Sequence, residues 1–304
     1  MEPGLPELFA DVSHIERKWL DIPYAGVSPA QALDIYLPAE GDGPFPVIFV
    51  IHGGGFEMGD KRHFMVAPFL TGLDRGYAVV AANYRLSGEA HFPAAVRDLK
   101  AAVRWLRANA AAYRLDPGRI AACGDSAGGN LAAMLATSEG AVLFDDATLG
   151  NVEQSSAVQA AVDWYGPMDF YSMPEQLEAN GLPVGPPPGP PVGMPDIPFP
   201  GSGPSPEVKY LGAELEAVPH LVRAADPETY LHPGIPPILI QHGDADGLVP
   251  VQQSIEFAQL IERRVGPRRC ELDILEGAGH GTPEFGSPDN MERVFRFLDR
   301  HLRP

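Results

Sequence analysis

Residues 124–128 read Gly-Asp-Ser-Ala-Gly, and this G-x-S-x-G pattern constrains the fold more than any other stretch of the chain. The short apolar run at 119–123 predicts a buried strand, and the helix formers at 130–136 predict a helix. A strand that turns sharply into a helix strains the backbone at the bend, and the residues two positions away must be small. Ser126 lies at that bend and is therefore the candidate nucleophile.

Strand and helix patterns alternate along most of the chain. The continuous apolar run at 46–51 is typical of a strand covered on both faces, and 77–82 predicts the next buried strand. Further strands are predicted at 157–165, 237–241 and 271–275. Helical patterns lie at 64–74, 93–111, 251–263 and 291–302, and alternating stretches at 18–24 and 32–37 indicate antiparallel edge strands. This order predicts an α/β fold with a mostly parallel sheet of about eight strands and helices on both faces.

One region interrupts the alternation, because proline and glycine dominate the chain between Gly181 and Pro206. Proline lacks the N–H group that a helix interior or a central strand needs, so neither is expected there. The α/β pattern resumes afterwards. We therefore expect a Pro/Gly-rich loop at about 172–206, inserted in one domain that spans 1–304, rather than a linker between two domains. The loop could cover a pocket with its apolar residues, which are Leu182, Val184, Met194, Ile197 and Phe199. Alternatively, it could be a solvated loop without a role.

Acyl transfer by a serine requires a base that takes the hydroxyl proton, a carboxylate that holds the base, and hydrogen-bond donors for the developing oxyanion. His280 is the candidate base. It follows the strand predicted at 271–275 on a loop whose neighbouring residues are glycines, whereas most of the other histidines lie in segments without catalytic context.

The loop that follows the strand at 237–241 offers two carboxylates, Asp244 and Asp246. Asp246 lies deeper in the turn before the next helix and is favoured as the acid, whereas Asp244 could instead cap the turn. A calcium loop fits poorly, because no later glutamate has the required spacing. The resulting chain order of Ser126, then Asp246, then His280 is the order expected for an α/β-hydrolase.

Candidate oxyanion donors come from two places in the chain. One is the backbone N–H of Ala127, directly after the nucleophile, and the others are N–H groups of the glycine run at 53–55. Three consecutive glycines cost backbone entropy, so we expect this backbone to approach another group closely. His52 precedes the run and is expected to anchor it rather than to act as a second base.

Two motifs together resemble the hormone-sensitive-lipase group of α/β-hydrolase esterases: His-Gly-Gly-Gly-Phe at 52–56 and Gly-Asp-Ser-Ala-Gly-Gly-Asn at 124–130. Phe-Pro-Ala-Ala at 92–95, Tyr-Gly-Pro-Met-Asp-Phe at 165–170 and His-Gly-Asp-Ala-Asp-Gly-Leu-Val-Pro at 242–250 resemble its branch of bacterial feruloyl- and acetyl-esterase-like proteins. The likeness runs from about Leu33 to the C-terminus. It departs from the family in a shorter N-terminal segment and a longer Pro/Gly loop.

The resemblance implies a serine carboxylesterase that hydrolyses short-acyl esters through an acyl-enzyme intermediate. The family's oxyanion hole corresponds here to Gly54, Gly55 and Ala127, and its acid corresponds to Asp246. No metal or organic cofactor is implied. Two alternatives stay open: an amide hydrolase of the arylformamidase type, which could use the same triad, and a non-catalytic ligand-binding protein on the same scaffold.

The net charge and the composition limit the classes of partner that the protein is expected to bind. A net charge of −18 disfavours nucleic acid and anionic membranes, since both would repel the protein, so we expect a small-molecule ester as the partner. A homodimer through edge strands or the last helix is left open. No secretion signal is evident at the N-terminus, which predicts a cytoplasmic location. The two cysteines, Cys123 and Cys270, are expected to be small core residues rather than a disulfide pair.

Overall fold

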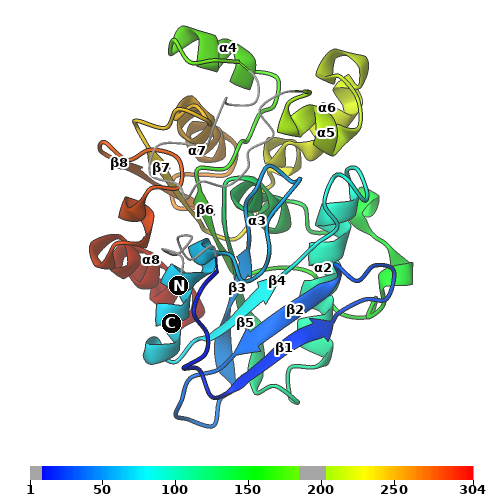
Figure 1. Cartoon of the computed structure of the whole chain (residues 1–304), viewed down its shortest axis with the longest axis vertical. Helices are drawn as coiled ribbons and strands as arrows, with labels where there is room; N and C mark the ends of the chain where they lie inside the picture. Colours follow the sequence, from blue (N-terminus) through cyan, green and yellow to red (C-terminus); the bar gives the residue numbers. More distant parts are fainter. Residues whose placement is uncertain (1–8, 185–202, 304) are drawn as a thin grey trace, which may run out of the picture.

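The computed structural model describes residues 9–184 and 203–303, which form a central sheet of eight strands with helices on both faces (Figure 1). The strands follow the order β1-β2-β4-β3-β5-β6-β7-β8 across the sheet. Their bounds are β1 Lys18–Pro23, β2 Ala32–Tyr36, β3 Phe45–Ile51, β4 Ala78–Ala82, β5 Leu115–Asp125, β6 Ala160–Trp164, β7 Ile238–Gly243 and β8 Cys270–Leu275.

The sheet is parallel from β4 to β8, whereas β1 and β2 pair antiparallel at one side of it. Every residue of β3 is buried, as expected for a strand that helices cover on both faces. This architecture confirms the mostly parallel α/β sheet of about eight strands predicted from the sequence.

Helices connect the strands and pack on the two faces. Their bounds are α1 Ala67–Leu70, α2 Ala94–Ala108, α3 Ala127–Thr137, α4 Met173–Ala179, α5 Pro206–Leu211, α6 Pro219–Ala225, α7 Gln252–Arg264 and α8 Pro288–Leu302. Short 3₁₀ turns lie at η1 Phe64–Val66, η2 Thr71–Arg75, η3 Val142–Phe144, η4 Ala147–Leu149, η5 Leu215–Ala217, η6 Pro227–Tyr230 and η7 Pro283–Gly286.

The core has two halves because successive residues of a strand point to opposite faces of the sheet. In β3, Val47 and Phe49 join one apolar cluster with residues of α2, α3 and α7. Ile48 and Val50 join the other cluster with residues of α1 and α8. Cys123 is fully buried in this second cluster, whereas Cys270 is half-buried and packs against the first.

Two sequence expectations need correction. The helix expected at 64–74 is a series of 3₁₀ and α turns, η1, α1 and η2, which ends at the left-handed Gly76. The loop expected at about 172–206 was wrong at its start, because α4 occupies 173–179. Pro174 stands in the first turn of α4, where no hydrogen bond is lost, so this proline starts the helix instead of preventing it. Most of the Pro/Gly stretch, 185–202, lies outside the described residues.

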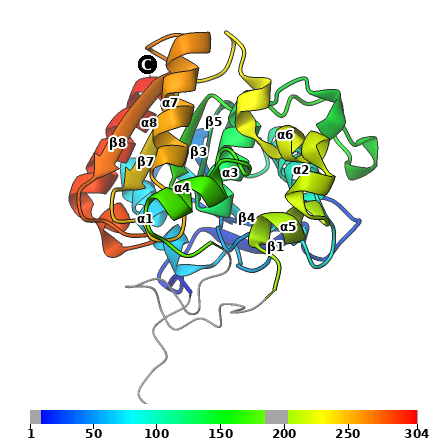
Figure 2. The same cartoon turned by 90° about the horizontal axis from the view of Figure 1, so that it is seen from above.

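The carboxyl ends of the parallel strands lie at one edge of the sheet, next to several short helices. In Figure 1, α4 lies beyond the strand ends on one side and α5 with α6 on the other, and the view from above in Figure 2 shows α4 and α5 in front of the sheet. Among the described residues, no helix combines the length and apolarity needed to cross a bilayer.

Candidate active site

Ser126 lies at the sharp turn between β5 and α3, with φ at 52°, in the left-handed region that side chains rarely adopt. Its backbone N–H donates to the carbonyl of Trp164 at 2.8 Å. A Cβ on Gly124 would lie 2.2 Å from the Gly128 carbonyl oxygen, and a Cβ on Gly128 would lie 2.1 Å from the Ile51 carbonyl oxygen. Glycine is therefore required two positions before and after the serine, because any side chain there would clash with the backbone.

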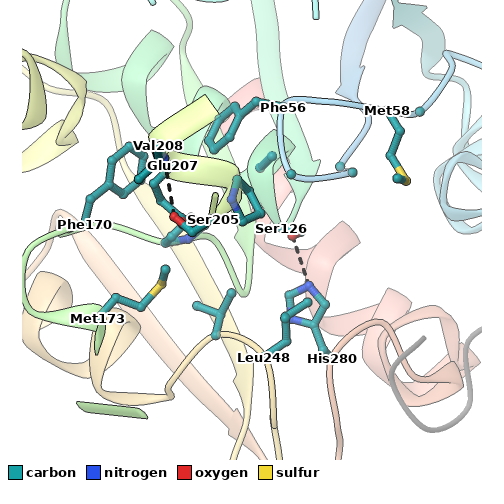
Figure 3. A pocket seen from close by; sticks show the side chains of 18 of the residues that line it. Phe56, Met58, Ser126, Phe170, Met173, Ser205, Glu207, Val208, Leu248 and His280 are labelled. Atoms are coloured by element: carbon teal, nitrogen blue, oxygen red, sulfur yellow. Dashed lines mark hydrogen bonds between the residues drawn. The ribbon is translucent and has the colours of Figure 1, made fainter. Parts of the chain in front are cut away.

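The structure brings Ser126, His280 and Asp246 into one hydrogen-bonded chain. Nε2 of His280 lies 3.0 Å from Oγ of Ser126 (Figure 3). Nδ1 of the same ring lies 2.7 Å from Oδ2 of Asp246. His280 follows β8, and Asp246 follows β7, so parallel strand ends carry all three side chains to the same edge of the sheet. This arrangement lets the imidazole accept the serine proton while the carboxylate holds the ring.

Four donors surround the buried Asp246 carboxylate. Oδ1 accepts the backbone N–H groups of Leu248 and Val249 at 2.8 and 2.9 Å, and Oδ2 faces both His280 and Nε2 of His242, the latter at 3.2 Å. Burial by itself would raise the pKa of Asp246, but the charge and hydrogen bonds of the two histidines outweigh it and hold the pKa well below its usual range. The carboxylate therefore stays ionised beside His280.

Asp244, the alternative acid, lies outside this chain of hydrogen bonds. Its side chain is exposed, and Oδ1 accepts the backbone N–H of Gly277 at 2.6 Å. This contact ties the loop after β7 to the loop after β8. Asp244 therefore holds together the two loops that carry Asp246 and His280.

The glycine run lies beside the nucleophile in a conformation that needs glycine. Gly54 and Gly55 have φ values of 109° and 60°. The N–H of Gly53 donates to Oδ1 of Asp125 at 3.1 Å, whereas the N–H groups of Gly54, Gly55 and Ala127 find no acceptor within the described parts of the chain. These three N–H groups are the ones that the sequence assigned to an oxyanion hole, and they are free to donate to a ligand.

His52 has a structural place behind the glycine run. Its Nδ1 lies 2.8 Å from the Gly53 carbonyl oxygen, and its ring stacks on Tyr84 with the ring centres 4.5 Å apart. Burial lowers the pKa of His52, so the ring is neutral near neutral pH. These contacts fit the anchoring role expected from the sequence.

Three residues of the site were missed by sequence reasoning, although each lies within or beside a quoted motif. Asp125 fixes the glycine run through Gly53, and burial raises its pKa to about 6. His242 contacts Asp246 through Nε2 while its Nδ1 lies 2.7 Å from Oγ of Ser254. Tyr165 packs edge-on against the His280 ring at 4.6 Å between centres. Each of the three lies in a quoted motif, which could have marked it as part of the site. The contacts that each residue makes are known only from the fold.

A pocket of about 580 Å³ opens next to Ser126 and His280. Its walls are mostly apolar, and the side chains of Phe56, Phe170, Met173 and Leu248 are drawn in Figure 3. Of the loop residues expected to cover a pocket, Val184 lines it and Leu182 packs against the cluster of Met173, Leu177 and Val249. Met194, Ile197 and Phe199 lie outside the described residues.

Comparisons with known proteins identify the family of the chain. The sequence profile of the BD-FAE family matches residues 33–261. The chain is 31% identical over 270 residues to a probable carboxylic ester hydrolase, LipM, of Mycobacterium tuberculosis, and this match covers 88% of the chain and 57% of LipM. The chain therefore spans less than two thirds of the length of that curated relative.

Solved structures of esterases also resemble the chain. A truncated carbohydrate esterase from gut microbiota has a TM-score of 0.78 at 26% identity, and the match covers 99% of this chain and 100% of that one. Esterase 2 of Thermogutta terrifontis, solved with propionate bound, has a TM-score of 0.70 at 26% identity, with 96% and 97% covered. The Thermogutta enzyme has also been solved after phosphorylation by paraoxon.

Proposed function

Since the chain belongs to the BD-FAE family, we propose that it is a serine carboxylesterase that hydrolyses short-acyl esters through an acyl-enzyme intermediate. The observation that carries the proposal is the continuous chain of hydrogen bonds from Oγ of Ser126 through the His280 ring to Asp246, at the mouth of an apolar pocket. The propionate held by the related Thermogutta esterase supports a short acyl group.

In the proposed first half-reaction, His280 takes the hydroxyl proton of Ser126 as Oγ attacks the ester carbonyl carbon. The carbonyl oxygen becomes an oxyanion that accepts hydrogen bonds from the N–H groups of Gly54, Gly55 and Ala127. When the tetrahedral intermediate collapses, the bond to the leaving oxygen breaks, and His280 gives its proton to the departing alcohol. The acyl group stays on Ser126.

In the second half-reaction, water replaces the alcohol. His280 removes a proton from the water as its oxygen attacks the acyl carbon, and the same three N–H groups stabilise the second oxyanion. Collapse breaks the bond to Oγ of Ser126, which regains the proton from His280. The carboxylic acid leaves and the enzyme returns to its starting state, while Asp246 holds the imidazole in one orientation throughout.

The experiment is an acyl-chain series of p-nitrophenyl esters from acetate to dodecanoate, with Ser126→Ala as the control. We expect turnover to peak at acetate or butyrate and to vanish in the control. Formyl anilides with matched leaving groups test the amide alternative, since faster cleavage of these amides than of the esters would favour an arylformamidase. Absence of turnover on every ester and amide would favour the binding-protein alternative and reject the proposal.

We also propose that residues 1–304 form one α/β-hydrolase domain and that the protein is cytoplasmic. A homodimer through edge strands or the last helix stays open as the alternative to a monomer. The match to the truncated carbohydrate esterase, which covers 99% of this chain, supports the single domain. Sedimentation at several protein concentrations tests the dimer, and a single constant mass of 32.6 kDa would reject it.

A further inference from the structure

One buried glutamate lines the pocket together with the nucleophile. Glu207 belongs to the first turn of α5, is only 6% exposed, and lines the same pocket as Ser126 and His280. Figure 3 shows its side chain next to Ser205, among the side chains that surround the pocket. Glutamate is among the residue types that are rarely buried so fully unless a partner compensates the charge.

Close packing fixes the position of Glu207 relative to the reacting end of the pocket. A Cβ on Gly55 would lie 3.1 Å from Cβ of Pro206, so the first turn of α5 rests directly against the glycine run. The hydroxyl oxygen of Ser205 accepts the N–H of Val208 at 3.4 Å, which holds the start of the helix. Glu207 therefore lies on a wall that adjoins the proposed oxyanion donors.

No cation compensates Glu207 within the described ranges 9–184 and 203–303. The basic residue of the same helix, Lys209, pairs with Glu57 at 2.9 Å instead. Burial raises the pKa of Glu207, while hydrogen bonding to Ser205 and to its own backbone acts in the opposite direction. A buried carboxylate without a cation is costly, and a ligand that brings a positive charge or a hydrogen-bond donor would relieve that cost.

The charged residues around the pocket reinforce the effect of Glu207. The described pocket lining includes neither lysine nor arginine. It includes five acidic residues: Asp60, Asp125, Glu207, Glu214 and Glu216. An anionic substrate group would therefore meet only like charges here, without a basic side chain to bind it.

We propose that Glu207 is a specificity-determining residue, whose carboxylate favours esters that bear a hydroxyl or a cationic group in the pocket and disfavours esters that bear a carboxylate. The inference rests on the proposed ester hydrolysis. A glutamate that only stabilised the start of α5 would leave the enzyme indifferent to the charge of its substrate, so substrate discrimination separates the two roles.

The test compares esters that differ only at their far end. Pentyl acetate is compared with acetates whose alcohol ends in a hydroxyl, a trimethylammonium or a carboxylate group, at matched chain length. A second series of methyl hexanoate and its 6-hydroxy, 6-trimethylammonio and 6-carboxylate counterparts places the same groups on the acyl side. Acid release is followed in a pH-stat at 0.15 M salt, where charges farther than about 8 Å are largely screened.

In the native enzyme, we expect kcat/KM for the carboxylate-ended ester to be at least about tenfold below that of the apolar ester in one of the two series. The hydroxyl- or cation-ended ester should match or exceed the apolar one. Glu207→Gln should reduce the ratio of kcat/KM between the apolar and the carboxylate-ended ester by about fivefold or more. Glu207→Asp keeps the carboxylate and should retain most of this ratio. Glu216→Gln removes an exposed charge from the same pocket and should change the ratios by less than about twofold.

Equal rates for carboxylate-ended and apolar esters in both series of the native enzyme would overturn the proposal, whether or not the variants fold. Unchanged ratios in a Glu207→Gln enzyme that still hydrolyses pentyl acetate would also overturn it. Hydrolysis of the apolar esters by the native protein, absent in Ser126→Ala, tests the proposed function separately, so failure of either idea is recognised by a different measurement.

Discussion

The two walls of the pocket come from different parts of the fold. The catalytic wall consists of the strand-end loops that carry Ser126, Asp246, His280 and the glycine run. The opposite wall consists of α4, α5 and η5, which lie between β6 and β7 in the chain and include Met173, Leu177, Glu207 and Leu215.

The walls also differ in how they are held. Hydrogen bonds of 2.7 and 3.0 Å join Ser126, His280 and Asp246, and Asp125 ties the glycine run to the end of β5. On the opposite wall, Met173 and Leu177 of α4 are held by apolar packing against Val249 of the loop after β7. The difference indicates that the sheet positions the reacting groups, whereas the connection between β6 and β7 shapes what the pocket accepts.

The largest expected effect concerns the catalytic wall alone. Ser126→Ala removes the nucleophile, and turnover of p-nitrophenyl butyrate should fall by roughly 10⁶. Stability should change little, because the Ser126 hydroxyl bonds only to His280 within the described residues. Steady-state kinetics and the thermal midpoint measure the two quantities. A variant that keeps a tenth of its activity would show that another group attacks the ester.

The second prediction compares two carboxylates in one loop. Asp246→Asn should lower turnover by about 10⁴, because the amide cannot hold the imidazole as the carboxylate does. Asp244→Asn is the matched control and should stay within about threefold of the native enzyme, since this side chain contacts Gly277 rather than His280. The reverse order of the two losses would move the acid role to Asp244.

The third prediction concerns the buried carboxyl of Asp125, whose pKa is raised to about 6. Between about pH 4 and pH 6 the unfolded chain releases this proton while the folded protein retains it, so Asp125 lowers stability as pH rises. Asp125→Asn has no proton to lose. The stability of the variant relative to the native protein should therefore rise across that window, by up to about 3 kcal/mol, and then level off.

Urea unfolding at pH 4, 5, 6, 7 and 8 measures this difference between the two proteins. Activity should fall by no more than about tenfold, because the amide oxygen can still accept the Gly53 N–H. A stability difference that stays constant with pH would show that Asp125 ionises near its ordinary pKa in the folded state.

The smallest expected effect belongs to the opposite wall. Leu177→Ala enlarges the pocket from α4 and should move the preferred acyl chain of p-nitrophenyl esters to longer lengths, with turnover of the acetate within about threefold. Stability should fall by about 2–3 kcal/mol. Leu298→Ala, at a buried position of α8 outside the pocket lining, should lower stability by a similar amount without moving the chain-length optimum. A shift in both variants would point to general loosening of the fold.

The sequence predicted the catalytic wall better than the opposite one for a physical reason. Buried strands have a readable pattern, and their carboxyl ends meet at one edge, so Ser126, Asp246 and His280 could be expected to approach one another. Sequence order could not show that Asp244 bonds to Gly277, because this contact forms only after β7 and β8 pair. It also could not show that His242 touches Asp246, because that contact depends on how the turn after β7 folds.

The helices of the opposite wall carry a weaker signal. With seven and six residues, α4 and α5 are too short to be stable by themselves or to display a clear period, and tertiary contacts stabilise them. The cluster of Met173, Leu177 and Val249 joins residues more than seventy positions apart in the chain. No sequence pattern distinguishes Glu207 from a surface acid, since its burial depends on where α5 lies against Gly55.

The position of β8 at one side of the sheet also matters during synthesis of the protein. A growing chain that has already formed the turn at Ser126 lacks Asp246 for another 120 residues and His280 for another 154. A nascent chain therefore carries an inert serine until its last strand emerges from the ribosome and docks. Hydrolysis of a chromogenic ester during cell-free translation would consequently report the moment at which folding is complete.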